Sequence, residues 1–156
     1  MVDVVKEQNG DHLTVRINGS IEESVDFEKL IGEPPKKLTI NTKGVSRINS
    51  VGVKAWIKYF QNAASKGTEL TFVECSTAIV EQINLISNFT CGGRVESIFV
   101  PFTSEDDNSE LVGLFKVDDL IKMNFEIPPL KNPKTGGKAV FDDIPEEYFG
   151  FLMKDS

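Results

Sequence analysis

The spacing of apolar residues alternates along the chain between a period of two and a period near 3.6, which predicts strands alternating with helices. A hairpin opens the chain, with strands at 2–5 and 13–17 joined through Asn9-Gly10, a dipeptide typical of tight turns. Further strands are predicted at 37–42, 70–73 and 95–102, and helices at 22–31, 50–65 and 76–89. This order predicts an α/β fold in which helices cover a mixed sheet, with the hairpin as its antiparallel part.

The change from strand to helix at Ser50 is the most informative local feature. Apolar residues follow Ser50 at helical spacing, so we expect this serine to be the N-cap of the helix. Phosphorylation would add roughly two negative charges at pH 7, which a helix N-terminus holds with its backbone N–H groups and its dipole. The sequence therefore predicts a switch at Ser50 that leaves the fold intact. The same spacing assigns Trp56 and Phe60 to the core rather than to a binding site.

The pattern changes after residue 102. Residues 103–110 form an acidic loop without apolar periodicity, followed by predicted strands at 111–117 and 138–141 with turn residues between them. Asp142–Pro145 begins a short terminal helix, whose aromatic residues we expect to anchor the tail. The chain is thus expected to comprise a domain over 1–102 and a small, β-rich, acidic appendage over 103–156.

Charge and cysteine content restrict the classes of partner. The net charge of −7 disfavours nucleic acid and anionic membranes, because both repel an acidic protein. Residues 1–100 carry 12 acidic and 11 basic side chains, and residues 101–156 carry 12 and 6, so the acidity lies in the appendage. Cys75 and Cys91 fit neither a disulfide framework nor a metal knuckle, and we expect reduced thiols. No apolar run is long enough to span a bilayer and no signal peptide opens the sequence, so a cytoplasmic location is expected.

The order of elements over residues 2–102 resembles the STAS family, which includes anti-sigma factor antagonists and the tails of sulphate transporters. The closest local resemblance is Asn49-Ser50-Val51-Gly52-Val53. In antagonists this turn reads Asp-Ser-Ser or Asp-Ser-Ala, then Gly and an aliphatic residue, and a partner kinase phosphorylates the serine after the Asp. The resemblance implies that Ser50 is the phosphoacceptor and Gly52 the close-packing residue, and that Asn49 replaces the family's Asp.

The appendage has a second resemblance, to a bacterial subgroup in which a zinc-ribbon-like segment follows this domain. The similar stretches are 100–107, 132–136 and 141–149. The subgroup's paired cysteines fall here on Ser104 and Asp107, and on Asn132 and Thr135. Since zinc requires thiolate or imidazole ligands, we expect the knuckle shape with no metal and no other cofactor.

Together these features predict a non-enzymatic domain that binds a protein partner, an anti-sigma factor or serine kinase by resemblance. We expect Asn49, Val51, Gly52, Lys54 and Lys58 to contact that partner, and phosphorylation of Ser50 to weaken binding. Catalysis is disfavoured because the chain has no nucleophile elbow and no phosphate-binding glycine loop, and its one histidine lies beside a distant turn. Three alternatives stay open: the lysine face of the helix is only solvated, the domain is a constitutive scaffold or accessory subunit, or the appendage binds metal through unusual ligands.

Overall fold

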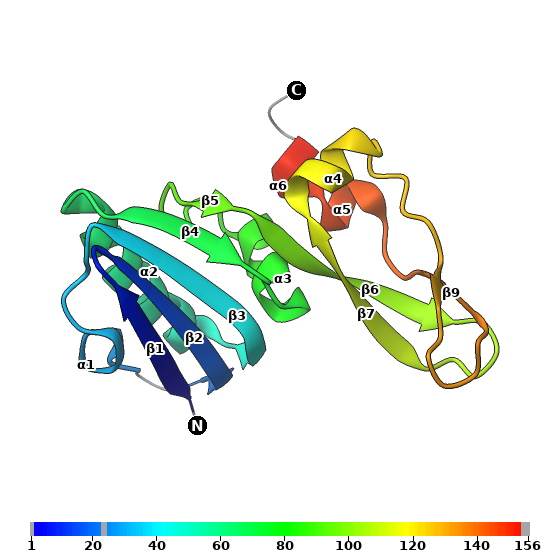
Figure 1. Ribbon diagram of the computed structural model, residues 1–156, viewed down its shortest axis with the longest axis horizontal. Coiled ribbons are helices and arrows are strands. Elements are labelled where there is room, and N and C mark those ends of the chain that lie inside the picture. Colours follow the sequence, from blue (N-terminus) through cyan, green and yellow to red (C-terminus); the bar gives the residue numbers. More distant parts are fainter. Residues whose placement is uncertain (1, 23–24, 154–156) are drawn as a thin grey trace.

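The computed structural model describes residues 2–22 and 25–153, and it contains two β-sheets that meet near residue 97 (Figure 1). The first sheet has the strand order β1-β2-β3-β4-β5 and lies in the N-terminal part of the chain. The second has the order β7-β6-β9-β8 and lies beside it, so that the molecule is elongated (Figure 1). The predicted α/β class is confirmed.

The first sheet is mixed. Its strands are β1 (Asp3–Asn9), β2 (His12–Ile21), β3 (Lys37–Ile48), β4 (Glu69–Val73) and β5 (Arg94–Val95). Strands β1 and β2 form the predicted antiparallel hairpin, and the other neighbours pair in parallel. Asn9 pairs with His12, so the two turn residues are Gly10 and Asp11 rather than Asn9-Gly10.

Three helices cover one face of this sheet: α1 (Phe27–Ile31), α2 (Ser50–Ser65) and α3 (Thr77–Leu85) (Figure 1). The strands alternate between buried apolar residues on the helix side and polar residues on the open side. Trp56 and Phe60 are fully buried among aromatic rings, which confirms their assignment to the core. The Trp56 indole N–H donates to the Phe89 carbonyl at 2.9 Å, so its polar atom is also satisfied.

Several predicted ends of strands and helices differ from those in the structure. Strand β3 runs to Ile48 rather than Thr42, because its second half pairs with the end of β2. Helix α3 ends at Leu85 rather than Phe89. The predicted strand at 95–102 is two strands, β5 in the first sheet and β6 (Ser97–Ser104) in the second. The expected domain boundary at residue 102 lies inside β6.

The second sheet is antiparallel and contains β6, β7 (Glu110–Lys116), β8 (Leu130–Lys131) and β9 (Lys138–Phe141). Three short helices pack beside it: α4 (Val117–Lys122), which the sequence analysis missed, α5 (Pro145–Tyr148) and α6 (Gly150–Met153). Tyr148 and Phe149 are buried, as expected for residues that anchor the tail. Asn84 of α3 joins the two parts, since its side chain donates to the Tyr148 carbonyl at 2.8 Å and accepts from the Phe151 N–H at 2.9 Å.

Candidate functional site

The candidate site lies where β3 passes into α2, and its helix cap differs from the predicted one. Asn49, rather than Ser50, is the N-cap: its side-chain Oδ1 accepts from the Gly52 N–H at 2.9 Å. Ser50 is the first residue of the helix itself. The prediction of Ser50 as N-cap is therefore wrong. Asn49 is favoured as the cap because its side-chain amide also donates a hydrogen bond, from Nδ2 to the Glu22 carbonyl at 2.6 Å. Ser50 makes no corresponding bond in the described structure.

Gly52 fixes the distance between α2 and the end of β2. A Cβ at Gly52 would lie 2.1 Å from the Ile21 carbonyl oxygen and 2.8 Å from Ile21 Cγ2, so no larger residue fits without a backbone shift. The Asn49 N–H donates to the same carbonyl at 3.2 Å. Together these contacts hold the first turn of α2 firmly against β2.

The residues that the sequence analysis assigned to partner binding divide between the surface and this packed base. Asn49, Ser50, Val51, Lys54 and Lys58 are exposed. Gly52 is buried and acts from beneath the surface. Ser50 is an exposed residue, and its hydroxyl makes no hydrogen bond within the part of the chain that the structure describes.

Two further charged residues adjoin the site and were missed from the sequence. Arg47 and Glu22 form an ion pair of 3.6 Å, with side-chain exposures of 74% and 41%. This pair is exposed and contributes little stability, so Arg47 remains a cation available to a partner. Its position three residues before Ser50 was the signal that could have identified it.

The single histidine, His12, lies far from Ser50. His12 pairs with Lys37 at the start of β3, whereas Ser50 follows the end of that twelve-residue strand. At about 3.3 Å per residue, roughly 30 Å or more separates them. His12 instead hydrogen-bonds Thr39 Oγ1 at 2.6 Å on the open face of the sheet. The described residues therefore contain no histidine base for Ser50.

The four positions expected from the zinc-ribbon resemblance lie in two similar turns that face each other. In the first turn the Ser104 N–H donates to the Ser109 carbonyl and the Asn108 N–H returns to the Ser104 carbonyl, at 2.9 and 3.0 Å. In the second turn the Asn132 N–H donates to the Gly137 carbonyl and the Gly136 N–H donates to the Asn132 carbonyl, both at 2.8 Å. The same pair of backbone hydrogen bonds therefore occurs in both turns.

Hydrogen bonds fill the space between the two turns. The buried Asn132 side chain donates from Nδ2 to Ser104 Oγ at 3.0 Å and to the Asp107 carboxylate at 3.4 Å. Its Oδ1 accepts from the Lys134 N–H at 2.9 Å, which fixes the orientation of the amide. Amide hydrogens therefore point toward the centre of the cluster, and this donor arrangement does not fit a metal cation.

The carboxylates at the rim of this cluster are held ionised. The hydrogen bond from the Ser104 hydroxyl, followed by that from Thr135, lowers the pKa of Asp106. The Ser109 hydroxyl and N–H lower the pKa of Asp107. No group of three or more His, Cys, Asp or Glu side chains arranged for metal binding occurs among residues 2–22 and 25–153.

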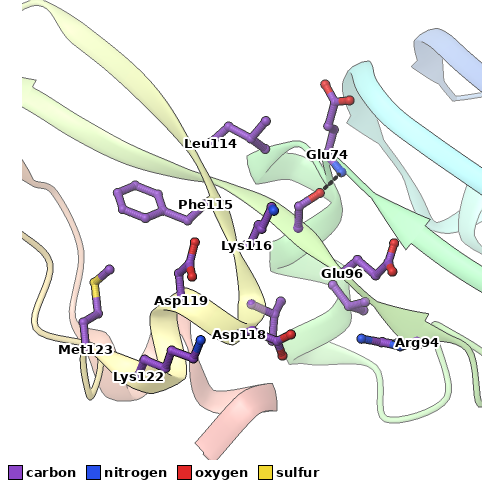
Figure 2. Close-up of a pocket in the computed structure, with 13 residues that line it drawn as sticks. Glu74, Arg94, Glu96, Leu114, Phe115, Lys116, Asp118, Asp119, Lys122 and Met123 are labelled. Carbon is purple, nitrogen blue, oxygen red and sulfur yellow. Dashed lines mark hydrogen bonds between the residues drawn. The ribbon is translucent and has the colours of Figure 1, made fainter.

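A groove of about 1020 Å³ separates the end of the first sheet from the second (Figure 2). Four carboxylates and three cations line it, among them Glu74, Arg94 and Lys116. Glu74 has a φ of +47° and is held by hydrogen bonds from Asn41 Nδ2 to its carboxylate and from its own N–H to Ser97 Oγ. The mixed lining selects neither sign of charge, so the groove alone indicates no ligand.

Both cysteines are buried and free. Burial raises the pKa of Cys75 to about 12 and also raises the pKa of Cys91, so both are protonated thiols at neutral pH. Across the described residues, every helix is too short or too polar to cross a bilayer.

Among known proteins, this chain is similar in fold to solved structures. No family model matches the sequence, and no curated protein matches it. The crystal structure of an anti-sigma factor antagonist from Mycobacterium paratuberculosis superposes with a TM-score of 0.48 at 20% sequence identity. The similarity covers 61% of this chain and 85% of that chain.

Proposed function

We propose that this chain is a cytoplasmic regulatory domain of the anti-sigma factor antagonist type, which acts by binding a protein partner and not by catalysis. Its contact surface comprises Asn49, Val51, Lys54 and Lys58 around Ser50, and Gly52 beneath it. The partner is an anti-sigma factor or a related serine kinase, and phosphorylation of Ser50 releases it. The single observation that carries the proposal is the Ser50 hydroxyl, exposed in the first turn of α2 and not needed to cap the helix.

The separation of capping from modification supports a switch at Ser50. Because Asn49 provides the cap, modification of the Ser50 oxygen removes no bond that holds α2 in place. A phosphate at the first helical residue also lies where the helix dipole favours negative charge. The modified chain therefore keeps its fold, and only the surface changes.

Local charge gives the direction of the effect. Arg47, Lys54 and Lys58 against Glu22 give the surface a net charge of +2 by formal count, on a chain whose total is −7. A basic surface of this kind favours an acidic patch on the partner. A phosphate adds about −1.5 to −2, which neutralises the surface and places negative charge directly in the interface. Binding should weaken accordingly.

The rigid base of the site supports recognition of a preformed surface. Gly52 and the cap of Asn49 hold the first turn of α2 against Ile21 and Glu22, so little ordering is needed on binding. Gly52 lies directly beneath the exposed residues. A substitution at Gly52 should therefore shift the first turn of α2 and alter partner binding in that way.

The test compares four forms of the full chain, each used to capture partners from extracts of its own cell. We expect the same protein to bind the wild type and Ser50→Ala, to be lost with Ser50→Asp, and to be retained by Ser65→Asp, a control at the other end of α2. Intact-mass spectra of the native protein should show a phosphate that Ser50→Ala lacks. If Ser50→Asp captures the partner as the wild type does, the switch is wrong. Partner binding without phosphate under any growth condition would indicate a constitutive scaffold instead.

We further propose that the C-terminal segment is a zinc-ribbon-like unit in which hydrogen bonds replace the metal. What supports this is the pair of equivalent turns at Ser104 and Asn132, and an amide that directs hydrogens toward their centre. A serine hydroxyl, two carboxylates and a carboxamide satisfy one another there without a cation. Elemental analysis that found stoichiometric zinc in the purified chain would contradict this reading.

A further inference from the structure

Among the sheet edges formed by the described residues, β7 is the one long edge without protection against pairing. The described residues leave four sheet edges, at β1, β5, β7 and β8. Strands β5 and β8 are two residues long, and β1 carries three charged residues in seven. Strand β7 has seven residues, Glu-Leu-Val-Gly-Leu-Phe-Lys, with charges only at its two ends. Short length and charge are the usual means of blocking an edge, whereas β7 is seven residues long and uncharged between its two ends.

The outer edge of β7 is also regular. Its register with β6 runs without a shift from Glu110 opposite Thr103 to Lys116 opposite Ser97, so no bulge bends it away. Val112 and Leu114 are 56% and 51% exposed on one face of the strand. An unbroken strand with exposed apolar residues is suited to accept a further strand.

Hydrogen bonds at both ends of the β6–β7 ladder indicate which backbone groups of β7 do not bond to β6. The Val117 N–H donates to Glu96 at 2.8 Å, and the Ser104 N–H donates to Ser109 at 2.9 Å. Hydrogen-bonded pairs alternate along an antiparallel ladder, so the odd-numbered residues of β7 bond to β6. The even-numbered residues direct their N–H and C=O groups outward; they are Glu110, Val112, Leu114 and Lys116.

We propose that the β7 edge pairs antiparallel with the β7 edge of a second copy of this chain, about a twofold axis at Gly113. In this register each residue lies opposite the one equally far from Gly113. Glu110 then faces the second copy's lysine at position 116, and Val112 faces its leucine at position 114. All four outward-directed residues fall into hydrogen-bonded pairs.

Charge complementarity selects the second copy over another partner. The strand has a negative residue at its start and a positive residue at its end, so a twofold antiparallel pair places opposite charges together at both ends. Two valines and two leucines meet between these ion pairs on the exposed face. The interface is isologous, as twofold dimers require, and it joins the two second sheets into one continuous sheet.

The surroundings of β7 leave room at the end that Lys116 occupies. Lys116 and Leu114 line the groove between the two sheets, and Figure 2 shows them together with Glu96 and Arg94, which line the same groove. Glu110 lies at the opposite end, beside the turn that leads from β6. Both charged ends of the strand are exposed.

The test is sedimentation of the full chain over a dilution series, with matched charge variants. The wild type should pass from monomer to a dimer of twice the chain mass as concentration rises. Glu110→Lys and Lys116→Glu each convert two attractive pairs into repulsive ones, and each should raise the dimer Kd about tenfold or more. The double variant should restore the wild-type Kd, and Glu105→Lys, the same charge change in the neighbouring turn, should leave it unchanged.

Two results overturn the proposal. A wild type that stays monomeric at every concentration means that the edge is free or serves a strand of another protein. A dimer that neither single variant weakens, or that the double variant does not restore, means that the copies associate elsewhere. All of these substitutions lie at exposed positions, and circular dichroism should show that each variant keeps its fold.

Discussion

Replacing Asn49 with alanine should destabilise the protein, whereas replacing Ser50 should not. Asn49 makes two hydrogen bonds with its side chain, one accepted from Gly52 and one donated to the Glu22 carbonyl. Ser50 makes none among the described residues. The two adjacent positions thus separate the residue that holds the helix from the residue proposed for modification.

The magnitude follows from these two bonds. Loss of an N-cap costs about 1 kcal/mol of unfolding free energy, and loss of a partly exposed hydrogen bond costs about 0.5–1.5 kcal/mol. Asn49→Ala should therefore cost roughly 2 kcal/mol, which for a chain of 156 residues lowers Tm by roughly 4–8 °C. Ser50→Ala should lie within about 0.5 kcal/mol of the wild type. Asn49→Asp keeps the acceptor and loses the donor, and should fall between them.

The chain contains its own control for a serine cap. Ser76 caps α3 by accepting from the Ile79 N–H, so Ser76→Ala should cost about 1 kcal/mol. Urea unfolding of the three alanine variants, monitored by circular dichroism, gives the comparison. If Ser50→Ala costs as much as Asn49→Ala or Ser76→Ala, then Ser50 is a capping residue and the separation of roles is refuted.

Three other expectations concern packing, acid sensitivity and the two turns. Gly52→Ala should destabilise by about 3 kcal/mol or more because its Cβ meets the Ile21 carbonyl, whereas Gly150→Ala, where the nearest atom is 3.4 Å away, should cost little in urea unfolding. The lowered pKa of Asp106 gives stability that is complete above its unfolded value and is lost as pH falls through the folded value; Ser104→Ala should raise that pKa in an NMR titration. Four cysteines in the facing turns should bind one zinc per chain by elemental analysis, and a folded variant without zinc would refute the equivalence of the turns. Those substitutions are Ser104→Cys, Asp107→Cys, Asn132→Cys and Thr135→Cys.

Local signals predicted those parts of the fold that local physics determines. The opening hairpin and the strand over 138–141 were correct, although the turn falls on Gly10 and Asp11, because alternation and turn residues act within a few positions. The α4 helix was missed although Val117, Leu120 and Ile121 have helical spacing, since six residues give a weak periodic signal.

Tertiary contacts decided the features that the sequence left ambiguous. Asn49 and Ser50 are both good N-caps, and only the contact with Glu22, far away in sequence, selects Asn49. The second half of β3 contains Gly44 and polar residues, and pairing with β2 extends it. Glu96 ends β5 because its N–H bonds to Phe72 while its carbonyl bonds to Val117, so one residue joins both sheets.

The exposure of Ser50, Lys54 and Lys58 follows from the helical pattern, whereas the geometry of the helix cap does not. The exposed hydroxyl at Ser50 and the exposed lysines at 54 and 58 lie where the helical pattern placed them. The role of Gly52 as a close-packing residue came from the family resemblance, and its distance to Ile21 supplies the physical reason. The sequence did not predict Arg47 as part of the site, because the position of a strand residue relative to the next helix depends on where the strand ends.

A hydrogen-bonded cluster and a metal stabilise facing turns under different conditions. A zinc–thiolate site depends on metal supply and on reduced cysteines, because its binding free energy is part of the folding free energy. The cluster around Asn132 requires neither, but it depends on ionised Asp106 and Asp107 as acceptors. Their lowered pKa values keep them charged at neutral pH, and acid rather than chelation is the condition that should open these turns.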